Sequence, residues 1–493
     1  MNHLKTTHRR RRRRLRPQIV FILWALVIAL IFAIGIGIYK SAQGEIDEPE
    51  AEVNTPIEPN VPDESDAPES SDAPQESEEP EDEPEEPADE PEEPADEPEK
   101  PVVKPEEPAD EPEKPVIKPE EPKTPTEPKN PITPRPSVEG ETRLSFVAVG
   151  DNLIHQAIID DAKRLADERG LGEKYYFDSM YADFKEVFTA ADISFVNQES
   201  MIAGDDSAYA GYPHFNTPPQ MIDTLENLGI DVVNIATNHS LDLYGKGMRA
   251  CIDAFKNSGI TAIGGYVGKE DQDNIRIIEK EGIKIAFLAY TDFTNEYKLG
   301  TGYENIIVAK TDHALMKKQV AEARKIADLV FVSMHWGVEG SFQLSSSQNE
   351  SAQVLVDAGA DLIIGTHPHV IQEVKWKDRP DGKKTLIVYS LGNFISTMHP
   401  AYNMCGGLLS VDIVKNENGA YLENALITPT MTHYSLTRDS LRMYYLEDYS
   451  QALYDKHGTS IRSESNGWSY DKMVKTYKNT ISAEFLPEWV NNW

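Results

Sequence analysis

The chain contains almost no cysteine: Cys251 and Cys405 are the only two in 493 residues. A scaffold held together by several disulfide bridges is therefore excluded. A cysteine-rich zinc site is excluded as well, because the two residues lack the spacing of a metal-binding pair. Two alternatives stay open for them: a single disulfide, or two buried free thiols.

Positive charge is also scarce. The sequence holds 48 Lys and Arg against 83 Asp and Glu, which gives a net charge of −35 at pH 7. Proteins that bind nucleic acid usually carry a basic surface that neutralises phosphates. Residues 139–493 contain neither a basic patch nor a nucleic-acid-binding motif. We therefore expect no nucleic acid among the partners of this protein.

Aromatic residues are absent from residues 45–138, which instead hold 24 of the 33 prolines, with 34 acidic and 7 basic residues. Residues 92–105, EEPADEPEKPVVKP, recur at 106–119 with a single Val-to-Ile difference. Such a composition buries too little apolar surface to offset chain entropy. We predict a disordered spacer at residues 41–140, which proline stiffness would extend to on the order of 250–300 Å. A second interpretation is that its carboxylates bind calcium or the cell wall.

The sequence has one long uncharged run, from Ile19 to Tyr39. Its 21 residues are enough to span a bilayer as a helix. Basic residues precede the run and acidic residues follow it, so the positive-inside rule places residues 1–17 in the cytoplasm. We predict a transmembrane anchor at residues 18–40, with everything after it outside the cell. A cleaved signal peptide is the alternative, disfavoured because the run is long and no small-residue cleavage site follows it.

Strand-like and helical patterns alternate from residue 139 onward, which predicts an α/β fold. We place its core at residues 141–430 and a tyrosine-rich, largely helical extension packed on it at 431–493. The apolar runs that predict strands are residues 144–149, 192–196, 231–236, 284–289, 329–333, 361–364, 385–389, 408–414 and 422–427. The helical patterns are clearest at residues 247–257, 313–327 and 347–358.

The motif Gly365-Thr366-His367-Pro368-His369 follows an apolar run that reads as a buried parallel strand. In extended backbone, side chains alternate with period two, so both imidazoles of His-x-His would point to one side. Imidazole is a common ligand of transition metals. The alternative is a pair of hydrogen-bonded structural histidines.

Polar residues also follow other predicted strands, and the carboxyl ends of strands at one edge of a sheet converge. A mixture of carboxylate, amide and imidazole groups suits Mn, Fe or Zn better than Ca. We therefore predict a site for one or two such divalent ions. Each member has a structural alternative: a helix cap, a turn, or a hydrogen-bonded core residue. The candidate residues are Asp151, Glu199, Asn238, His239, His335, His367 and His369.

The order of these motifs resembles the CapA/PgsA family of capsule biosynthesis proteins over roughly residues 143–400. The motifs are Gly-Asp, Asn-x-Glu, Asn-His, His-Trp-Gly, Gly-x-His-Pro-His and Ser-Leu-Gly-Asn-Phe. That family is associated with poly-γ-glutamate production and the calcineurin-like metallophosphatase superfamily. The resemblance implies a four-layer α/β/β/α sandwich with a dinuclear metal site at one edge.

The resemblance also implies roles for individual residues. Glu199 would bridge two ions. His239 would be the acid near the leaving group or would stabilise the developing charge, and Asp151 would take part in catalysis. One ion would be held by Glu199, Asn238, His335 and His367, and the other by Asp151, Glu199 and His369.

The chain departs from the superfamily pattern after Asp151. The usual Asp-x-His motif reads Asp151-Asn152-Leu153 here, so one metal position lacks a histidine. His155 is a candidate substitute. Four further residues are predicted to contact substrate: Asn197, His214, Glu339 and Asn393. Three of them have an alternative. His214 would belong to a packed aromatic loop, Glu339 would act beside the metal ligands, and Asn393 would stabilise a turn.

The resemblance implies a membrane-anchored, extracellular metallophosphatase-like protein that acts in biosynthesis, export or anchoring of a poly-γ-glutamate capsule. Its expected partners are that polymer or another anionic one, the membrane subunits of a capsule synthase, and the bilayer through residues 19–39. One alternative is a non-catalytic, polymer-binding accessory subunit of the synthase. Another is a cell-wall phosphodiesterase unrelated to a capsule.

Overall fold

The computed structural model describes residues 138–493, apart from residue 173 and residues 462–466. The anchor predicted at residues 18–40 and nearly all of the predicted spacer lie outside this range. Among the described residues, no helix combines the length and apolar character needed to cross a membrane.

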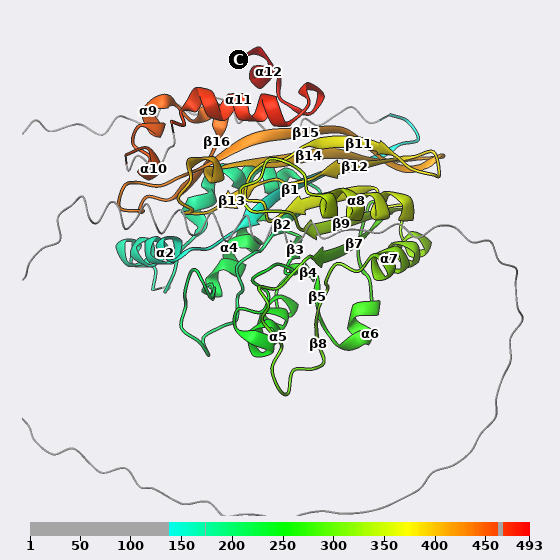
Figure 1. Ribbon diagram of the computed structural model, residues 1–493, viewed down its shortest axis with the longest axis horizontal. Helices are drawn as coiled ribbons and strands as arrows, with labels where there is room; N and C mark the ends of the chain where they lie inside the picture. Colours follow the sequence, from blue (N-terminus) through cyan, green and yellow to red (C-terminus); the bar gives the residue numbers. More distant parts are fainter. Residues whose placement is uncertain (1–137, 173, 462–466) are drawn as a thin grey trace, which may run out of the picture. The chain divides into compact units, whose positions relative to one another are not determined.

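The larger of two main sheets has eight strands (Figure 1). Its order is β16-β15-β14-β1-β2-β3-β4, and β13 pairs with β1. β1 runs parallel to β2 and antiparallel to β14, so the sheet joins the beginning of the domain to its end. Its strands are β1 (Thr142–Asn152), β2 (Ile193–Asn197), β3 (Val232–Asn234), β4 (Thr261–Ile263), β13 (Asn393–Ile395), β14 (Cys405–Asn416), β15 (Gly419–His433) and β16 (Arg442–Tyr445).

The second sheet has six strands in the order β11-β12-β10-β9-β7-β6. Its four central strands, β12, β10, β9 and β7, are parallel. A small two-stranded sheet, β5-β8, accompanies it. The strands of these two sheets are β5 (Gly265–Val267), β6 (Arg276–Lys280), β7 (Ile283–Thr291), β8 (Ile306–Val308), β9 (Leu329–His335), β10 (Leu362–Thr366), β11 (Val374–Asp378) and β12 (Lys384–Val388).

The two main sheets pack face to face through aromatic side chains. Phe146 of β1 lies edge-on to Phe331 of β9, with ring centroids 5.0 Å apart, and Phe287 of β7 lies beside both. Alternate residues of β9, such as Val330 and Val332, belong to a second apolar cluster on the far face of the six-stranded sheet. This alternation buries both faces of the strand, which explains its continuous apolar sequence.

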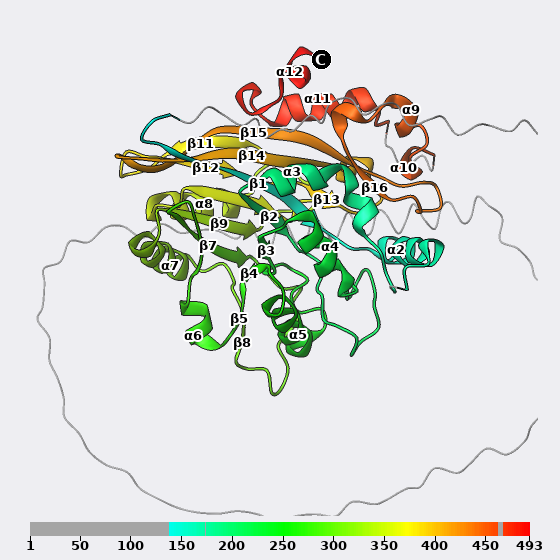
Figure 2. The same ribbon diagram turned by 180° about the vertical axis from the view of Figure 1, so that it is seen from behind.

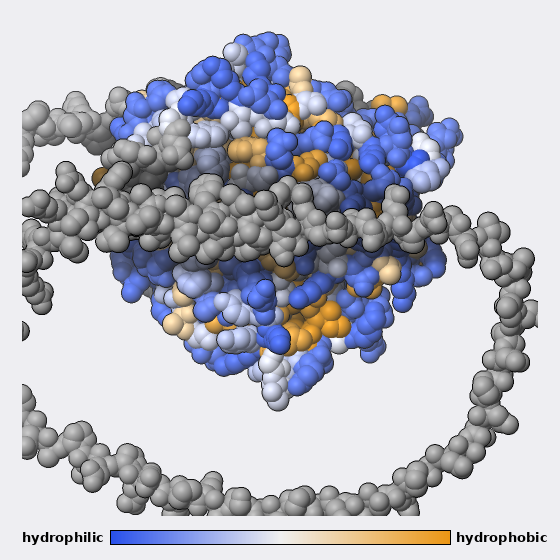
Figure 3. All heavy atoms as spheres, in the orientation of Figure 1, coloured by the Kyte–Doolittle hydropathy of each residue, from blue (hydrophilic) through white to orange (hydrophobic). Residues whose placement is uncertain are grey.

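Helices cover the outer faces of both sheets. α7 and α8 pack on the six-stranded sheet. On the other side, the Tyr477 hydroxyl of α11 donates to the Gly406 carbonyl of β14 at 2.6 Å. Phe184 of η1 and Phe188 of α3 pack on Phe394 of β13. Figure 2 shows α11 lying along this sheet beside β15. The order across the domain is thus helix, sheet, sheet, helix. On the face drawn in Figure 3, hydrophilic residues predominate and hydrophobic ones appear in scattered areas.

Among the described residues, the longest helices are α2, α5, α7 and α8, with 13 or 14 residues each. The helical segments are α2 (Gln156–Arg169), η1 (Asp178–Phe184), α3 (Lys185–Ala190), α4 (Gln220–Leu228), α5 (Tyr244–Lys256), α6 (Gly268–Asp273), α7 (His313–Ile326), α8 (Ser346–Ala358), η2 (Ala401–Met404), η3 (Leu446–Asp448), α9 (Gln451–Tyr454), α10 (Gly458–Ile461), α11 (Tyr470–Thr480), η4 (Ala483–Phe485) and α12 (Glu488–Asn492).

The predicted α/β class is confirmed, and every strand predicted from an apolar run is present within a few residues. The boundary that we placed after residue 430 falls inside β15, and β16 adds an edge strand to the same sheet. Of the two alternatives for the cysteines, the structure has the free thiols: Cys251 in α5 and Cys405 in β14 are both buried and unpaired with each other.

The buried imidazole of His457 predicts that the domain loses stability in acid. Its Nε2 donates to the Thr432 carbonyl at 3.0 Å, and its Nδ1 accepts from the Thr459 backbone N–H at 3.1 Å, so the ring is held neutral. Burial lowers the pKa of His457 to about 3. In the unfolded chain the histidine pKa is about 6.5, so below this pH the unfolded state binds a proton that the folded state does not bind. Stability should be unaffected above pH 6.5 and fall by about 1.4 kcal/mol per pH unit between 6.5 and 3.

This effect can be measured by urea unfolding of the full-length protein between pH 7 and pH 4. We expect His457→Gln to have a shallower pH dependence than the wild type, whereas the matched control His313→Gln, at the start of α7, should keep the wild-type slope. An unchanged slope in His457→Gln would contradict the assignment.

Candidate metal centre

Chemically active side chains from both main sheets meet where their strands end. The eight-stranded sheet contributes residues at or just after the ends of β1, β2 and β3, and the six-stranded sheet contributes residues at the ends of β9 and β10. The first group is Asp151, Glu199 and Asn238; the second is His335, His367 and His369. The prediction of a single sheet edge was therefore too simple, because the site lies at an edge that two packed sheets share.

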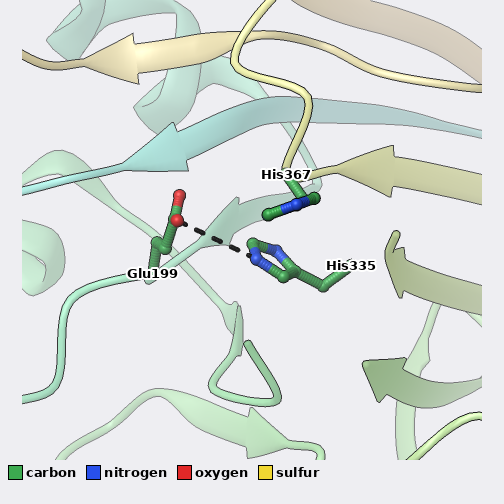
Figure 4. Close-up of side chains that lie close together, drawn as sticks. All are labelled: Glu199, His335 and His367. Atoms are coloured by element: carbon green, nitrogen blue, oxygen red, sulfur yellow. Dashed lines mark ion pairs between the residues drawn. The ribbon is translucent and has the colours of Figure 1, made fainter. Parts of the chain in front are cut away.

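The first cluster combines Glu199, His335 and His367, each of which offers a ligand atom within 4.8 Å of the others. Glu199 Oε1 lies 3.8 Å from His335 Nε2, and Figure 4 shows the carboxylate pointing toward that ring with the His367 ring beside it. Asn238 Oδ1 lies 2.9 Å from the same His335 nitrogen. The structure thus brings together all four residues predicted for one ion.

The second cluster combines Asp151, Glu199 and His369 within the same 4.8 Å limit. His369 Nδ1 donates to Asp151 Oδ2 at 3.1 Å, and His369 Nε2 lies 3.6 Å from Glu199 Oε1. Glu199 belongs to both clusters, which is the arrangement expected of a bridging carboxylate. The ligand roles assigned to these residues stay predictions.

Several buried atoms of these clusters have no hydrogen-bond partner. They are both carboxylate oxygens of Glu199 and Nδ1 of His367. Burial raises the pKa of Glu199 well above its usual range, and burial together with neighbouring imidazoles lowers the pKa of His335 and of His367. Unpaired buried polar atoms are costly. A divalent cation bound by these atoms would satisfy them. Mn, Fe and Zn all accept such oxygen and nitrogen ligands, so the residues fit an ion of this kind.

The pKa of His369 also indicates that this part of the site favours positive charge. Burial opposes its protonation, but the Glu199 and Asp151 carboxylates dominate and raise the pKa of His369 to about 10. The imidazolium therefore supplies positive charge between two buried carboxylates, as a metal ion would.

The backbone of the His-Pro-His motif differs from the extended form we predicted. His367 has φ 93° and His369 has φ 57°, both in the left-handed region that non-glycine residues seldom occupy. β10 ends at Thr366 and the chain then turns, so the rings come within 5.7 Å through the turn and not through strand alternation. Backbone strain of this kind is typical of functional sites.

Gly365 is required just before this turn. A Cβ at this position would lie 1.9 Å from the Tyr389 carbonyl oxygen and 2.7 Å from Trp336 Nε1, so only glycine lets β10 approach these neighbours.

Two amides predicted to contact substrate instead hold the ligands in place. Asn197 Nδ2 donates to Asp151 Oδ1 at 2.7 Å, while its Oδ1 accepts from Asn234. Asn393 Oδ1 accepts from His369 Nδ1 at 3.0 Å, while its Nδ2 donates to the Asn403 carbonyl. Both side chains are fully buried. Their engaged amides leave no free group for a substrate, so we revise their role to positioning.

His239 is oriented by a residue that we did not predict from the sequence. Its Nδ1 lies 2.8 Å from Asp242 Oδ2, which also accepts from the Phe215 backbone N–H at 2.8 Å. The Phe215 ring packs edge-on against the imidazole, with centroids 4.6 Å apart. The available signal was an aspartate three residues after the histidine, a spacing that lets two side chains on a turn meet.

Two further histidines lie outside the ligand clusters. His214 lies on the loop that carries Phe215 and is exposed. Its Nε2 lies 2.6 Å from the Tyr297 hydroxyl. His155 packs on Phe215, and its Nδ1 accepts from the Thr397 backbone N–H at 3.3 Å. His155 belongs to none of the ligand groups found among the described residues.

The exposed residue Glu339 lies next to the histidines of the motif. One of its carboxylate oxygens and one nitrogen each of His367 and His369 lie within 4.8 Å of one another. We predicted a contact to substrate or a role beside the ligands; the structure puts this carboxylate at a distance from which it could bind an ion itself.

Comparisons with known proteins find relatives of this chain among capsule biosynthesis proteins. The chain is 25% identical over 314 residues to the PGA biosynthesis protein CapA of Bacillus subtilis, covering 63% of this chain and 78% of the relative. It is 33% identical over 186 residues to the capsule biosynthesis protein CapA of Bacillus anthracis, covering 37% and 44%. Among solved structures, a 5'-nucleotidase precursor from Thermus thermophilus matches with TM-score 0.37 and 14% identity over 58% of this chain and 54% of that one.

A family model described as "Bacterial capsule synthesis protein PGA_cap" matches residues 145–398, just over half of the chain. This range contains every ligand candidate described above. The chain belongs to the bacterial capsule synthesis protein family PGA_cap.

Proposed function

We propose that this protein is a metal-dependent hydrolase of the calcineurin-like type, anchored in the cell membrane and acting outside the cell in poly-γ-glutamate capsule biosynthesis. Its family and the names of its Bacillus relatives support the link to capsule synthesis. The apolar run at residues 19–39 and the acidic, proline-rich residues 41–140 support an anchor and a spacer.

One observation carries the enzymatic part of the proposal. Glu199 is a buried carboxylate whose two oxygens both lack a hydrogen-bond partner, and it lies between His335 and His369. A protein that needed this residue only for stability would supply hydrogen-bond donors to it, because a buried carboxylate without them is destabilising. A bound divalent ion supplies Lewis-acid polarisation of a phosphoryl or carbonyl oxygen and stabilises the charge that develops there.

His239 and Asp242 supply the proton that hydrolysis needs. When water adds to phosphorus or to an amide carbon, the leaving oxygen or nitrogen must be protonated. Nδ1 of His239 is engaged by Asp242. Nε2 is therefore the nitrogen from which a protonated His239 donates to the leaving atom, and Asp242 stabilises the imidazolium before transfer. The substrates that fit this chemistry are a phosphoester or the γ-glutamyl amide of the polymer.

The proposal is tested with the purified full-length protein loaded with Mn²⁺ or Zn²⁺. We expect stoichiometric bound metal by elemental analysis, and metal-dependent cleavage of a phosphoester or of poly-γ-glutamate. His367→Ala should lose metal and at least about 100-fold in rate, since several kcal/mol of charge stabilisation go with the ion. His313→Ala, on α7 and in none of the ligand clusters, is the matched control. Failure of the wild-type protein to bind metal would refute the proposal.

A further inference from the structure

The superfamily pattern leaves one metal position without its histidine, and the residues after Asp151 do not replace it. Asn152 is fully buried and its amide is engaged elsewhere. Its Nδ2 donates to Gln198 Oε1 at 2.7 Å, and its Oδ1 accepts from the Tyr181 hydroxyl at 2.7 Å. Leu153 carries no donor atom.

His155, the substitute that we considered from the sequence, is committed to a different role. It occupies the position before helix α2, and its Nδ1 accepts from the backbone N–H of Thr397. Its ring packs against Phe215, with centroids 5.5 Å apart. His155 belongs to none of the groups of neighbouring ligand atoms among the described residues, so it does not complete the metal position.

Glu339 approaches the position from the other sheet. It lies on the loop that follows β9, and its carboxylate falls within 4.8 Å of ligand atoms of both His367 and His369. The loop is tied to the motif, because the Gly340 N–H donates to the Pro368 carbonyl at 2.8 Å. A second, independent observation points to a ligand at this position: both carboxylate oxygens of Glu199, which belongs to it, are buried without a hydrogen-bond partner.

We propose that Glu339 is a metal ligand that replaces the missing histidine and completes the position formed by Asp151, Glu199 and His369. This inference deepens the proposed function and rests on its metal centre. The replacement exchanges a neutral nitrogen donor for an anionic oxygen, so that three carboxylates face one imidazole at this position. Oxygen-rich sites suit Mn²⁺ and nitrogen-rich sites suit Zn²⁺. The completed position therefore prefers Mn²⁺.

The exposure of Glu339 sets the order of binding. Asp151, Glu199 and His369 are at most 3% exposed, whereas Glu339 is exposed. An exposed carboxylate loses more conformational freedom on binding an ion than one that packing already holds in place. The position that Glu339 completes is therefore the weaker of the two, and it fills second.

The test measures Mn²⁺ binding to the full-length protein by equilibrium dialysis with elemental analysis, and the coupling between two Mn²⁺ ions by electron paramagnetic resonance. We expect two bound ions and a coupled spectrum in the wild type. Glu339→Gln should weaken the second ion at least about tenfold and abolish the coupled spectrum, since losing one charged ligand costs upward of 1.4 kcal/mol. Glu350→Gln, an exposed glutamate on α8, is the matched control and should bind as the wild type does.

A rescue variant separates ligation from a general effect of charge. Glu339→His restores an imidazole donor at the same place, so it should recover the second ion and shift its preference from Mn²⁺ toward Zn²⁺. Circular dichroism should show all variants folded, because residue 339 is exposed. Two wild-type-like ions in Glu339→Gln would overturn this inference and leave the hydrolase proposal standing. No metal in the wild type would overturn both.

Discussion

Replacing Glu199 by glutamine should abolish metal binding and lower the rate of hydrolysis by about a thousandfold or more. The carboxylate belongs to both ligand clusters, so a neutral amide at this position weakens both ion positions at once. The loss corresponds to several kcal/mol of charge stabilisation in the transition state. Elemental analysis of the purified variant and a parallel rate measurement check the two parts of the expectation, with Glu350→Gln as the control. A Glu199→Gln protein with the wild-type metal content would contradict it.

The same substitution should make the metal-free protein more stable. Both oxygens of Glu199 are buried without a partner, and burial raises its pKa well above the usual range. Removing an unsatisfied buried acid relieves a penalty of about 1–3 kcal/mol. Urea unfolding in the presence of a chelator should therefore show a higher midpoint for Glu199→Gln than for the wild type. A gain in stability that accompanies a loss of activity is the expected signature of a functional residue.

The second large effect is expected at His239. His239→Asn should lower the rate by roughly 10²–10⁴-fold, the usual contribution of a general acid, with its metal content unchanged. Asp242→Asn, which removes the carboxylate 2.8 Å from Nδ1, should also lower the rate while the ions stay bound.

This prediction also separates the enzyme from a non-catalytic accessory subunit. An accessory protein would use the same pocket only to bind polymer, so a strain carrying His239→Asn would make a normal capsule. A catalytic protein would not. His313→Asn controls for the loss of an imidazole elsewhere in the chain. Full capsule in the His239→Asn strain, with bound metal in the purified variant, would favour the accessory function.

Local sequence patterns predicted the individual elements well. β9 and β10 are continuous apolar runs because both of their faces are buried, and such runs are recognisable without any partner. α8 begins at a capping box formed by Ser345 and Gln348, which is a local signal of the same kind. The ligand candidates could be predicted as well, because they follow these runs directly in the sequence.

Other features depend on neighbours that are distant in the sequence. The antiparallel pairing of β1 with β14 joins Thr142 to Lys415, and no local pattern encodes it. The buried amides of Asn197 and Asn393 were read as substrate contacts because only the assembled sheets reveal the carboxylate and imidazole that they hold. The left-handed conformation of His367 likewise follows from tertiary packing, since position 367 is not a glycine.

The pairing of the first strand with a late one constrains when the active centre can exist. Asp151 and His369 are separated by 218 positions, and β1 stays an incomplete edge until β14 has been made or exported. Contacts of such long range form late in folding. If the chain crosses a membrane in order of its sequence, as proposed above, its metal centre would therefore assemble only after the passage, when the last third of the polypeptide arrives.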